Sequence, residues 1–342
     1  MKNFAIILSV ILMTGGPALI AQEAPTDELS YIPDISLDMR FGYGHDFAER
    51  AGRFGGNGLF LDINGQITPN LSYSLNHCLA NFEGWDEHGF GNTHWLTLTY
   101  ENDWFYVSAG KEDVKIGSFE YDTYDMDSYM EMNSLFWNNI SPWQWGVSAG
   151  WYPAEGHTIL AQACNSPFSA LDTPNLFAYA LGWRGEWDVY ESYWTTNMWQ
   201  FDKGRYVKAL NLGNRFHFND FSFDLEYTTR CTDIRNAFTG DFTLIFAPSY
   251  EWEWGRAFAK VGWERIKEDN LGYEFSGDNL FYGAGAEFFP FKEYKDIRLH
   301  AIWASNTNLT AGHYLNIGLT WKMNLTDAGK KLFNKIKKTK NE

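Results

Sequence analysis

The sequence predicts an all-β fold, a transmembrane antiparallel β-barrel of about 16 strands with a constriction loop folded inward. Apolar and polar residues alternate from Asp34 onward in short segments, which is typical of strands that present two different faces. Aromatic residues make up 18% of the chain, yet its mean hydropathy is only −0.37. This combination suits a wall with one face in lipid and the other in water.

Residues 1–21 have the pattern of a secretory signal peptide. Lys2 supplies the positive end, Ala5 to Met13 form an apolar core, and Ala21 is a small residue before the expected cut. We therefore expect the mature chain to leave the cytoplasm, with the barrel over residues 22–325 and a basic periplasmic tail over residues 326–342. After the N-terminus, no apolar run approaches the roughly 20 residues of a membrane-spanning helix.

The first predicted strand shows the alternation that recurs along the chain. Leu37 and Met39 belong to an apolar face, whereas Asp38 and Arg40 belong to the opposite, polar face. The same pattern predicts further strands at 59–64, 71–80, 95–100, 105–110, 143–151 and 157–165. Pro69 and Asn70 are turn-forming residues between two of these segments.

The second half of the chain repeats this scheme. Strands are predicted at 177–184, 190–201, 205–216, 221–230, 244–252, 257–264, 280–288, 297–303 and 315–323, although the alternation does not fix which face of 190–201 points inward. Short connections alternate with longer ones, although the predicted longer connection at 202–204 is as short as a turn. Strands of about 9–13 residues can cross a bilayer when tilted. A closed ring is needed because an open edge would leave backbone groups unpaired in lipid.

A soluble β-sandwich is the alternative fold, because its strands alternate too. It would have to accommodate many outward tryptophans, which in a barrel form aromatic girdles at the two membrane interfaces. Tryptophans that suit this role lie near strand ends: Trp143, Trp151, Trp183, Trp252 and Trp321.

Lys111 to Pro142 is the longest stretch that does not alternate, and it is acidic and aromatic. We interpret it as the constriction loop, because long loops in compact domains are usually functional. The carboxylates expected to line the pore constriction are Glu120, Asp122, Asp125, Asp127 and Glu131. Calcium binding by this loop is a weaker alternative, since the loop lacks the glycine and spacing of an EF-hand.

A basic wall is expected to face this acidic loop across the lumen. Its predicted members are Arg40, Arg184, Arg205, Arg215, Arg298 and Lys322. The alternation also places an acidic group inward, formed by Asp224, Glu226, Glu251, Glu264 and Glu287. Opposed rings of charge would create a transverse field in a narrow pore. Alternatively, these charges are solvated lumen residues that pair with one another.

Other classes of site find little support in the sequence. Three widely spaced cysteines, Cys78, Cys164 and Cys231, do not form a disulfide framework. A net charge of −16 argues against nucleic-acid binding. No nucleophile elbow, zinc-protease helix motif, phosphate loop or C-x-x-C motif occurs, so neither an enzyme nor a cofactor is expected.

Two stretches carry a family resemblance, namely GLFLDINGQITPNLSYSLNHCLANF and HWLTLTYENDWFYVSAGKEDVKIG. Over roughly residues 57–150, the chain resembles outer-membrane porins of the phosphate-selective O and P type, especially those of Bacteroidetes. The resemblance implies a trimeric 16-stranded porin whose third outer loop narrows the channel. Two features depart from that family: the third loop is acidic where anion-selective members carry arginine and lysine, and the chain continues past Trp321 into a lysine-rich tail.

We therefore expect a bacterial outer-membrane porin that passes small polar or charged solutes by passive diffusion, with a weak preference for cations. Its other expected partners are outer-membrane lipid and two further copies of the chain. The alternative is a surface barrel that acts as an adhesin or glycan-binding protein without transport. The tail could bind lipid through Leu332, Phe333 and Ile336, or it could extend into the periplasm.

Overall fold

The computed structural model describes residues 32–81, 84–85, 93–120, 133–138, 140–168, 175–238, 240–267, 276–292, 294–306 and 310–330. Contacts divide the chain into two units, Met1–Ile32 and Pro33–Glu342, and the second unit contains the barrel. The predicted signal peptide and most of the basic tail lie outside the described residues, so both stay predictions.

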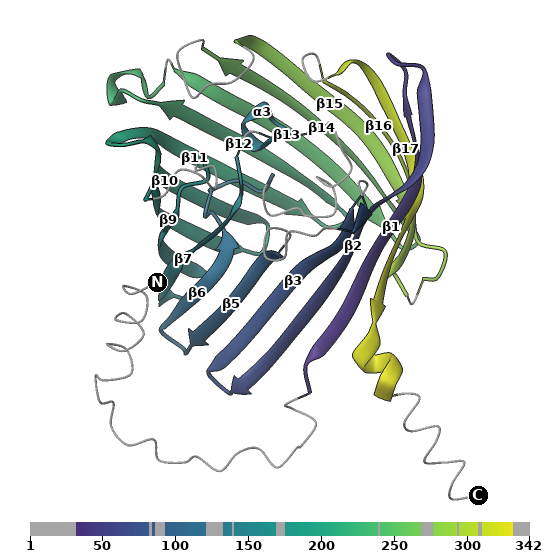
Figure 1. The fold of residues 1–342 in the computed structure, drawn as a ribbon, viewed down its shortest axis with the longest axis horizontal. Coiled ribbons are helices and arrows are strands. Elements are labelled where there is room, and N and C mark those ends of the chain that lie inside the picture. The colour runs from purple at the N-terminus through teal and green to yellow at the C-terminus, as the bar shows by residue number, and fades with distance from the viewer. Residues whose placement is uncertain are drawn as a thin grey trace, which may run out of the picture. The chain divides into compact units, whose positions relative to one another are not determined.

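The second unit is a closed antiparallel barrel of sixteen strands, to which a two-residue strand, β4, is added beside β3 (Figure 1). In chain order the strands are β1 (Asp34–Asp46), β2 (Ala51–Thr68), β3 (Leu71–Asn81), β4 (Gly84–Trp85), β5 (Thr93–Glu101), β6 (Phe105–Asp113), β7 (Trp143–Ala154), β8 (His157–Asn165), β9 (Phe177–Trp187), β10 (Tyr190–Asp202), β11 (Arg205–Phe218), β12 (Phe221–Cys231), β13 (Asp241–Trp252), β14 (Gly255–Ile266), β15 (Gly277–Phe288), β16 (Ile297–Asn306) and β17 (Thr310–Asn324). Pairing of β17 with β1 from Ser36↔Asn324 to Asp46↔Tyr314 closes the ring. The barrel prediction is confirmed, and the β-sandwich alternative is wrong.

Each strand presents one face inward and one outward, as the alternation predicts. On β1, the inward Asp38 and Arg40 are buried, whereas the outward Phe41 is 56% exposed. Outward aromatic rings touch one another in a series from Trp187 through Tyr190, Phe216 and Phe223 to Phe246. Their 4.8–5.7 Å centroid separations fit the aromatic girdle that a membrane interface favours.

Connections differ between the two ends of the barrel. Those of β2–β3, β5–β6, β7–β8, β9–β10, β11–β12 and β13–β14 are tight, and β1 begins and β17 ends at this same end, which we call the turn end. The longer β15–β16 connection also lies at the turn end, and the remaining connections, including that of β6 to β7, lie at the loop end. Only Lys203 and Gly204 separate β10 from β11, so this loop-end connection is indeed as short as a turn.

Helices are few in the described part of the chain. One four-residue helix, α3 (Leu135–Asn138), lies in the β6–β7 connection, residues 234–236 form a 3-10 turn, and residues 325–330 are helical after β17 (Figure 1). Among the described residues, no helix is long and apolar enough to cross a bilayer. Cys78, Cys164 and Cys231 are buried free thiols on β3, β8 and β12, so no disulfide joins them.

Candidate constriction loop and inner wall

The connection between β6 and β7 enters the bore in two described arms. We call residues 114–120 the outgoing arm, and residues 133–138 with 140–142 the returning arm. Val114 N donates to Pro142 O at 2.7 Å, so the arms begin and end side by side at the loop end. The predicted constriction carboxylates Asp122, Asp125, Asp127 and Glu131 lie between the arms and outside the described residues.

The outgoing arm follows the inner wall from strand to strand. Lys115 N donates to Gln162 Oε1 on β8 at 2.8 Å, and its carbonyl accepts from Asn197 Nδ2 on β10 at 2.9 Å. Further along, the hydroxyl of Ser118 donates to the carboxylate of Glu226 on β12. Because these partners are inward-facing side chains, this arm lies inside the barrel.

Gly117 allows the arm to press directly on the backbone of β10. Its N–H donates to Thr195 Oγ1 at 2.8 Å. A Cβ atom added at Gly117 would meet Thr195 N at 2.6 Å and Tyr193 O at 2.7 Å. Only a residue without a side chain fits at this distance without movement of the arm or the strand.

An apolar cluster fixes both arms to the wall of β8 to β11. Val114 and Ile116 come from the outgoing arm and Phe136 and Ile140 from the returning arm. The wall supplies Cys164, Ala178, Trp199, Val207 and Ala209. These buried contacts stabilise the loop's position within the barrel through the hydrophobic effect.

Glu120 ties the two arms to each other and to β14. Its Oε1 accepts from Ser134 N at 2.9 Å and lies 3.0 Å from Lys260 Nζ on β14, while its Oε2 accepts from Ser134 Oγ at 3.0 Å. Both partners of the ion pair are nearly inaccessible to solvent. Of the five predicted constriction carboxylates, the structure therefore describes one, and this one is held against the wall.

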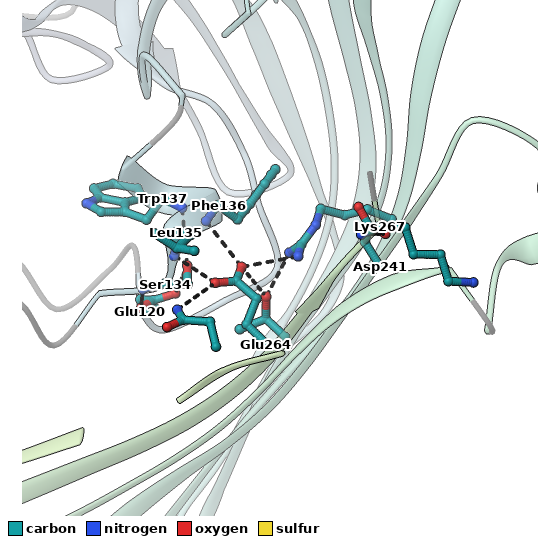
Figure 2. A network of polar contacts seen from close by, with 11 residues as sticks. Glu120, Ser134, Leu135, Phe136, Trp137, Asp241, Glu264 and Lys267 are labelled. Atoms are coloured by element: carbon teal, nitrogen blue, oxygen red, sulfur yellow. Dashed lines mark hydrogen bonds and ion pairs between the residues drawn. The ribbon is translucent and has the colours of Figure 1, made fainter. Parts of the chain in front are cut away.

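Glu264 on β14 holds the first turn of α3 (Figure 2). It accepts from Leu135 N at 2.8 Å and from Phe136 N at 3.2 Å. Arg230 Nη2 on β12 lies 3.2 Å from Glu264 Oε1, and Thr243 Oγ1 on β13 donates to the same oxygen at 2.9 Å. The side chains of Glu264 and Arg230 are 0% and 1% exposed, so their charges neutralise each other away from water.

Two guanidinium groups of the wall lie over aromatic rings of the loop. Arg230 is 4.5 Å from the centre of the Phe136 ring, and Arg215 is 4.2 Å from that of Phe119. Such cation–π contacts stabilise by about 0.5–2 kcal/mol each. They add to the attachment of the loop along β11 and β12.

Lys115 is held at the start of the outgoing arm by two carboxylates. Its Nζ lies 2.8 Å from Asp113 Oδ1 and 3.5 Å from Glu112 Oε2. Burial acts to lower the pKa of Lys115, but attraction to Asp113 and Glu112 outweighs burial and raises that pKa above its ordinary value. Lys115 is therefore protonated throughout the neutral range.

The predicted basic wall is divided into separate groups. Arg298 and Arg40 both pair in register with Thr320, and Lys322 is two residues further along β17, as barrel closure predicts. Arg40 lies 3.4 Å from Asp38, and Arg298 lies 3.9 Å from Glu287. These arginines face carboxylates of the wall itself.

Arg184 and Arg215 form a second group near the turn end. Arg184 lies 3.1 Å from Glu186 and 3.7 Å from Glu191, and Arg215 binds Asp224 through two bonds of 2.7 and 2.9 Å. Arg205 does not join them. It lies at the opposite end of β11, 62% exposed, with Asp202 at 3.7 Å.

The acidic group predicted from the alternation faces inward for the most part. Asp224, Glu226, Glu264 and Glu287 are buried on β12, β14 and β15. Glu251 instead lies near the turn end, half exposed, with Lys295 Nζ at 2.6 Å. Pairing among wall charges, the alternative that the sequence left open, therefore describes much of the inner wall.

A cavity of about 680 Å³ opens at the turn end of the bore. Its wall is polar and carries charges of both signs, including Arg215, Asp224, Glu251, Arg256 and Lys295. We call this cavity the vestibule, and the outgoing arm adjoins it because Phe119 contacts Arg215 of its lining. Among the described residues, no group of three or more potential metal-ligating side chains occurs, while most of the acidic segment considered for calcium lies outside them.

Several residues that hold the loop were not identified from the sequence as site residues. Gln162, Thr195 and Asn197 are neutral, and the sequence does not fix which face of their strands points inward. Arg230 and Lys260 have the inward phase, but nothing in the sequence pairs them with Glu264 and Glu120 across more than thirty residues.

Solved structures with a fold similar to that of this chain include porins and outer-membrane channels. No protein-family model matches the chain, and no curated protein sequence matches it significantly. A porin structure refined at 1.8 Å has a TM-score of 0.59 and 12% identity, and the match covers 85% of this chain and 100% of that one. OmpT, an outer membrane protein of Vibrio cholerae in its trimer form, has a TM-score of 0.59 and 13% identity, with 86% and 100% covered. The outer membrane channel DcaP of Acinetobacter baumannii has a TM-score of 0.61 and 10% identity, with 88% and 99% covered. None of these three is described as phosphate-selective, so the comparisons support the general porin fold: the chain is a closed β-barrel of the bacterial outer-membrane type.

Proposed function

We propose that the protein is an outer-membrane porin through which small polar solutes diffuse passively. The observation that carries this proposal is the attachment of the β6–β7 connection to the inner wall of a closed barrel, from Gln162 on β8 to Glu264 on β14. A loop inside the bore narrows it and brings polar groups close to a passing solute. Such a constriction has a purpose in a channel, whereas nothing in the described inner wall favours the adhesin alternative.

Reconstitution in a planar lipid bilayer tests this function. Purified protein, extracted in detergent, should produce stable stepwise increases in current, and its gel mobility should shift on heating as a closed barrel unfolds. A protein that shifts on heating but never conducts would contradict the channel and favour the adhesin.

We further propose a weak preference for cations, in contrast to the anion selectivity that the phosphate-porin resemblance implies. Arg40, Arg184, Arg215 and Arg298 each lie within 4 Å of a carboxylate of the wall. The positive charge that an anion would meet is thereby reduced, while the segment between the loop arms adds four carboxylates. The reversal potential in a salt gradient tests this, and a reversal potential that shows anion preference would contradict it.

We propose that the barrel assembles as a homotrimer, as the family resemblance implies. The trimer form of OmpT, which has the same fold, supports this assembly. Chemical cross-linking before extraction from the membrane should yield a species of three chains, and a protein that remains a single chain under those conditions would exclude it.

A further inference from the structure

We propose that Glu264, together with Arg230, is a positioning residue that holds the returning arm against β14 and thereby sets the width of the pore. This inference rests on the proposed channel function and adds the residues that fix its constriction. The sequence pattern indicates only that both side chains face inward.

The contacts of Glu264 use both oxygens of its carboxylate as hydrogen-bond acceptors. Its two oxygens accept from the backbone amides of Leu135 and Phe136, from the hydroxyl of Thr243 and from the guanidinium of Arg230. Every one of these partners is used as a donor, so the site needs acceptors at both oxygens. A glutamine of the same size would turn one NH₂ group toward these donors and lose part of the attachment.

Arg230 compensates the negative charge of the buried Glu264 carboxylate. It also donates from Nη1 to Thr243 Oγ1 at 2.8 Å, so Arg230, Thr243 and Glu264 form a closed triangle across β12, β13 and β14. Removal of one partner would leave an uncompensated buried charge, whereas removal of both charges is often tolerated. A variant that removes both charges therefore tests the position of the loop without the loss of stability expected when only one charge is removed.

The outgoing arm has an attachment of its own on the same strand. Lys260, four residues before Glu264 on the inner face of β14, holds Glu120. Loss of Glu264 therefore leaves the outgoing arm attached, while α3 loses the acceptor of its first two amides. We expect a change in pore width and in its fluctuation rather than loss of the barrel.

The experiment compares the wild-type full-length protein with E264Q and with the double variant R230M/E264M in planar bilayers. Both variants should retain the heat-dependent gel shift. Both variants should have a larger single-channel conductance than the wild type. Their open-channel current noise should rise several-fold. The double variant should unfold at a temperature closer to that of the wild type than a single R230M variant does.

E287Q provides the matched control. Glu287 is an equally buried carboxylate on the neighbouring strand β15, and its ion partners Arg256 and Arg298 both belong to the wall. We expect E287Q to lower thermal stability while the open-channel noise stays at the wild-type level. A rise in noise equal to that of E264Q would overturn the assignment.

The possible outcomes distinguish a failure of the role assigned to Glu264 from a failure of the proposed channel function. A silent wild-type protein counts against the channel itself. A conducting wild type with unchanged conductance and noise in E264Q and in the double variant overturns the role of Glu264, and the channel function stands. Wild-type noise in a stable double variant would likewise show that the buried pair contributes stability alone.

Discussion

At the residue scale, the position of the loop depends on Gly117, because no other residue has room where the arm meets β10. The contacts of 2.6 and 2.7 Å that a Cβ would make are with backbone atoms, which cannot rotate away. We expect Gly117→Val to destabilise the barrel by about 1–3 kcal/mol, the usual range for overpacking. The thermal midpoint of the gel shift measures this.

Gly204→Val serves as the comparison for this substitution. A Cβ at Gly204 meets nothing within 4 Å, although its φ of 74° makes any side chain unfavourable there. The Gly204 variant should lose stability from backbone strain but keep wild-type conductance, whereas the Gly117 variant should change both. Equal conductance in the two variants would argue against close packing of the arm on β10.

The charge of Lys115 determines the pH range over which the outgoing arm stays attached at its start. The folded state raises the pKa of Lys115, so its stabilisation is fully present below the unfolded value of about 10.4 and is lost only as pH rises through the folded value. We expect open-channel noise that is constant between about pH 6 and 9 and that increases only above about pH 10.4. In Lys115→Met the noise should already be raised at neutral pH, and a wild-type transition near neutrality would contradict this role.

At the element scale, we expect the acidic segment between the two loop arms to determine the sign of ion preference. Neutralisation of its four carboxylates in D122N/D125N/D127N/E131Q should move the reversal potential toward zero, since the local negative charge is removed. The matched change E49Q/D103N/E155Q/D188N removes four exposed carboxylates that do not line the vestibule, and it should leave the reversal potential nearly unchanged. Equal shifts in the two variants would assign the preference to net charge instead.

The alternation of each strand predicts which substitutions should destabilise the barrel in a bilayer. Val261 on β14 faces outward and is 42% exposed, whereas Ser249 on β13 faces the vestibule. Val261→Arg should destabilise the barrel by roughly 2–4 kcal/mol if it lies near the bilayer midplane, while Ser249→Arg meets water. Folding titrations in lipid vesicles measure the difference, and similar losses for both would contradict the assignment of faces.

Strand positions could be predicted from the sequence because successive side chains of a strand point to opposite faces, and the two faces of this barrel wall differ in polarity. β1 is an example: the phase that puts Asp38 and Arg40 inside follows from the outward Leu37 and Met39 alone. The attachment of the loop could not be predicted in this way, since Glu120–Lys260 and Glu264–Arg230 join distant segments with no common period. Arg205 illustrates a further limit. The alternation predicts which face of a strand a residue occupies but not where along the barrel axis it lies, and Arg205 lies at the loop end, away from Arg215.

At the scale of the whole barrel, closure and constriction depend on each other. Pairing of β1 with β17 removes the free edges of the sheet and encloses a lumen. The two arms are fixed inside that lumen by the apolar cluster on β8–β11, by the Glu120–Lys260 ion pair and by the hydrogen bonds to Glu264 on β14. We therefore expect a narrowed passage, and this is the basis for expecting selectivity among small solutes.

The central claim is that a loop held inside a closed barrel limits the flow of ions. Single-channel conductance of the wild type, compared with a variant in which residues 121–132 are replaced by a short glycine–serine linker, tests it most directly. We expect discrete steps from both proteins and a clearly larger step from the variant, because both arms stay attached while the segment between them is removed. Steps of equal size would contradict the constriction, and a wild-type protein without steps would contradict the channel.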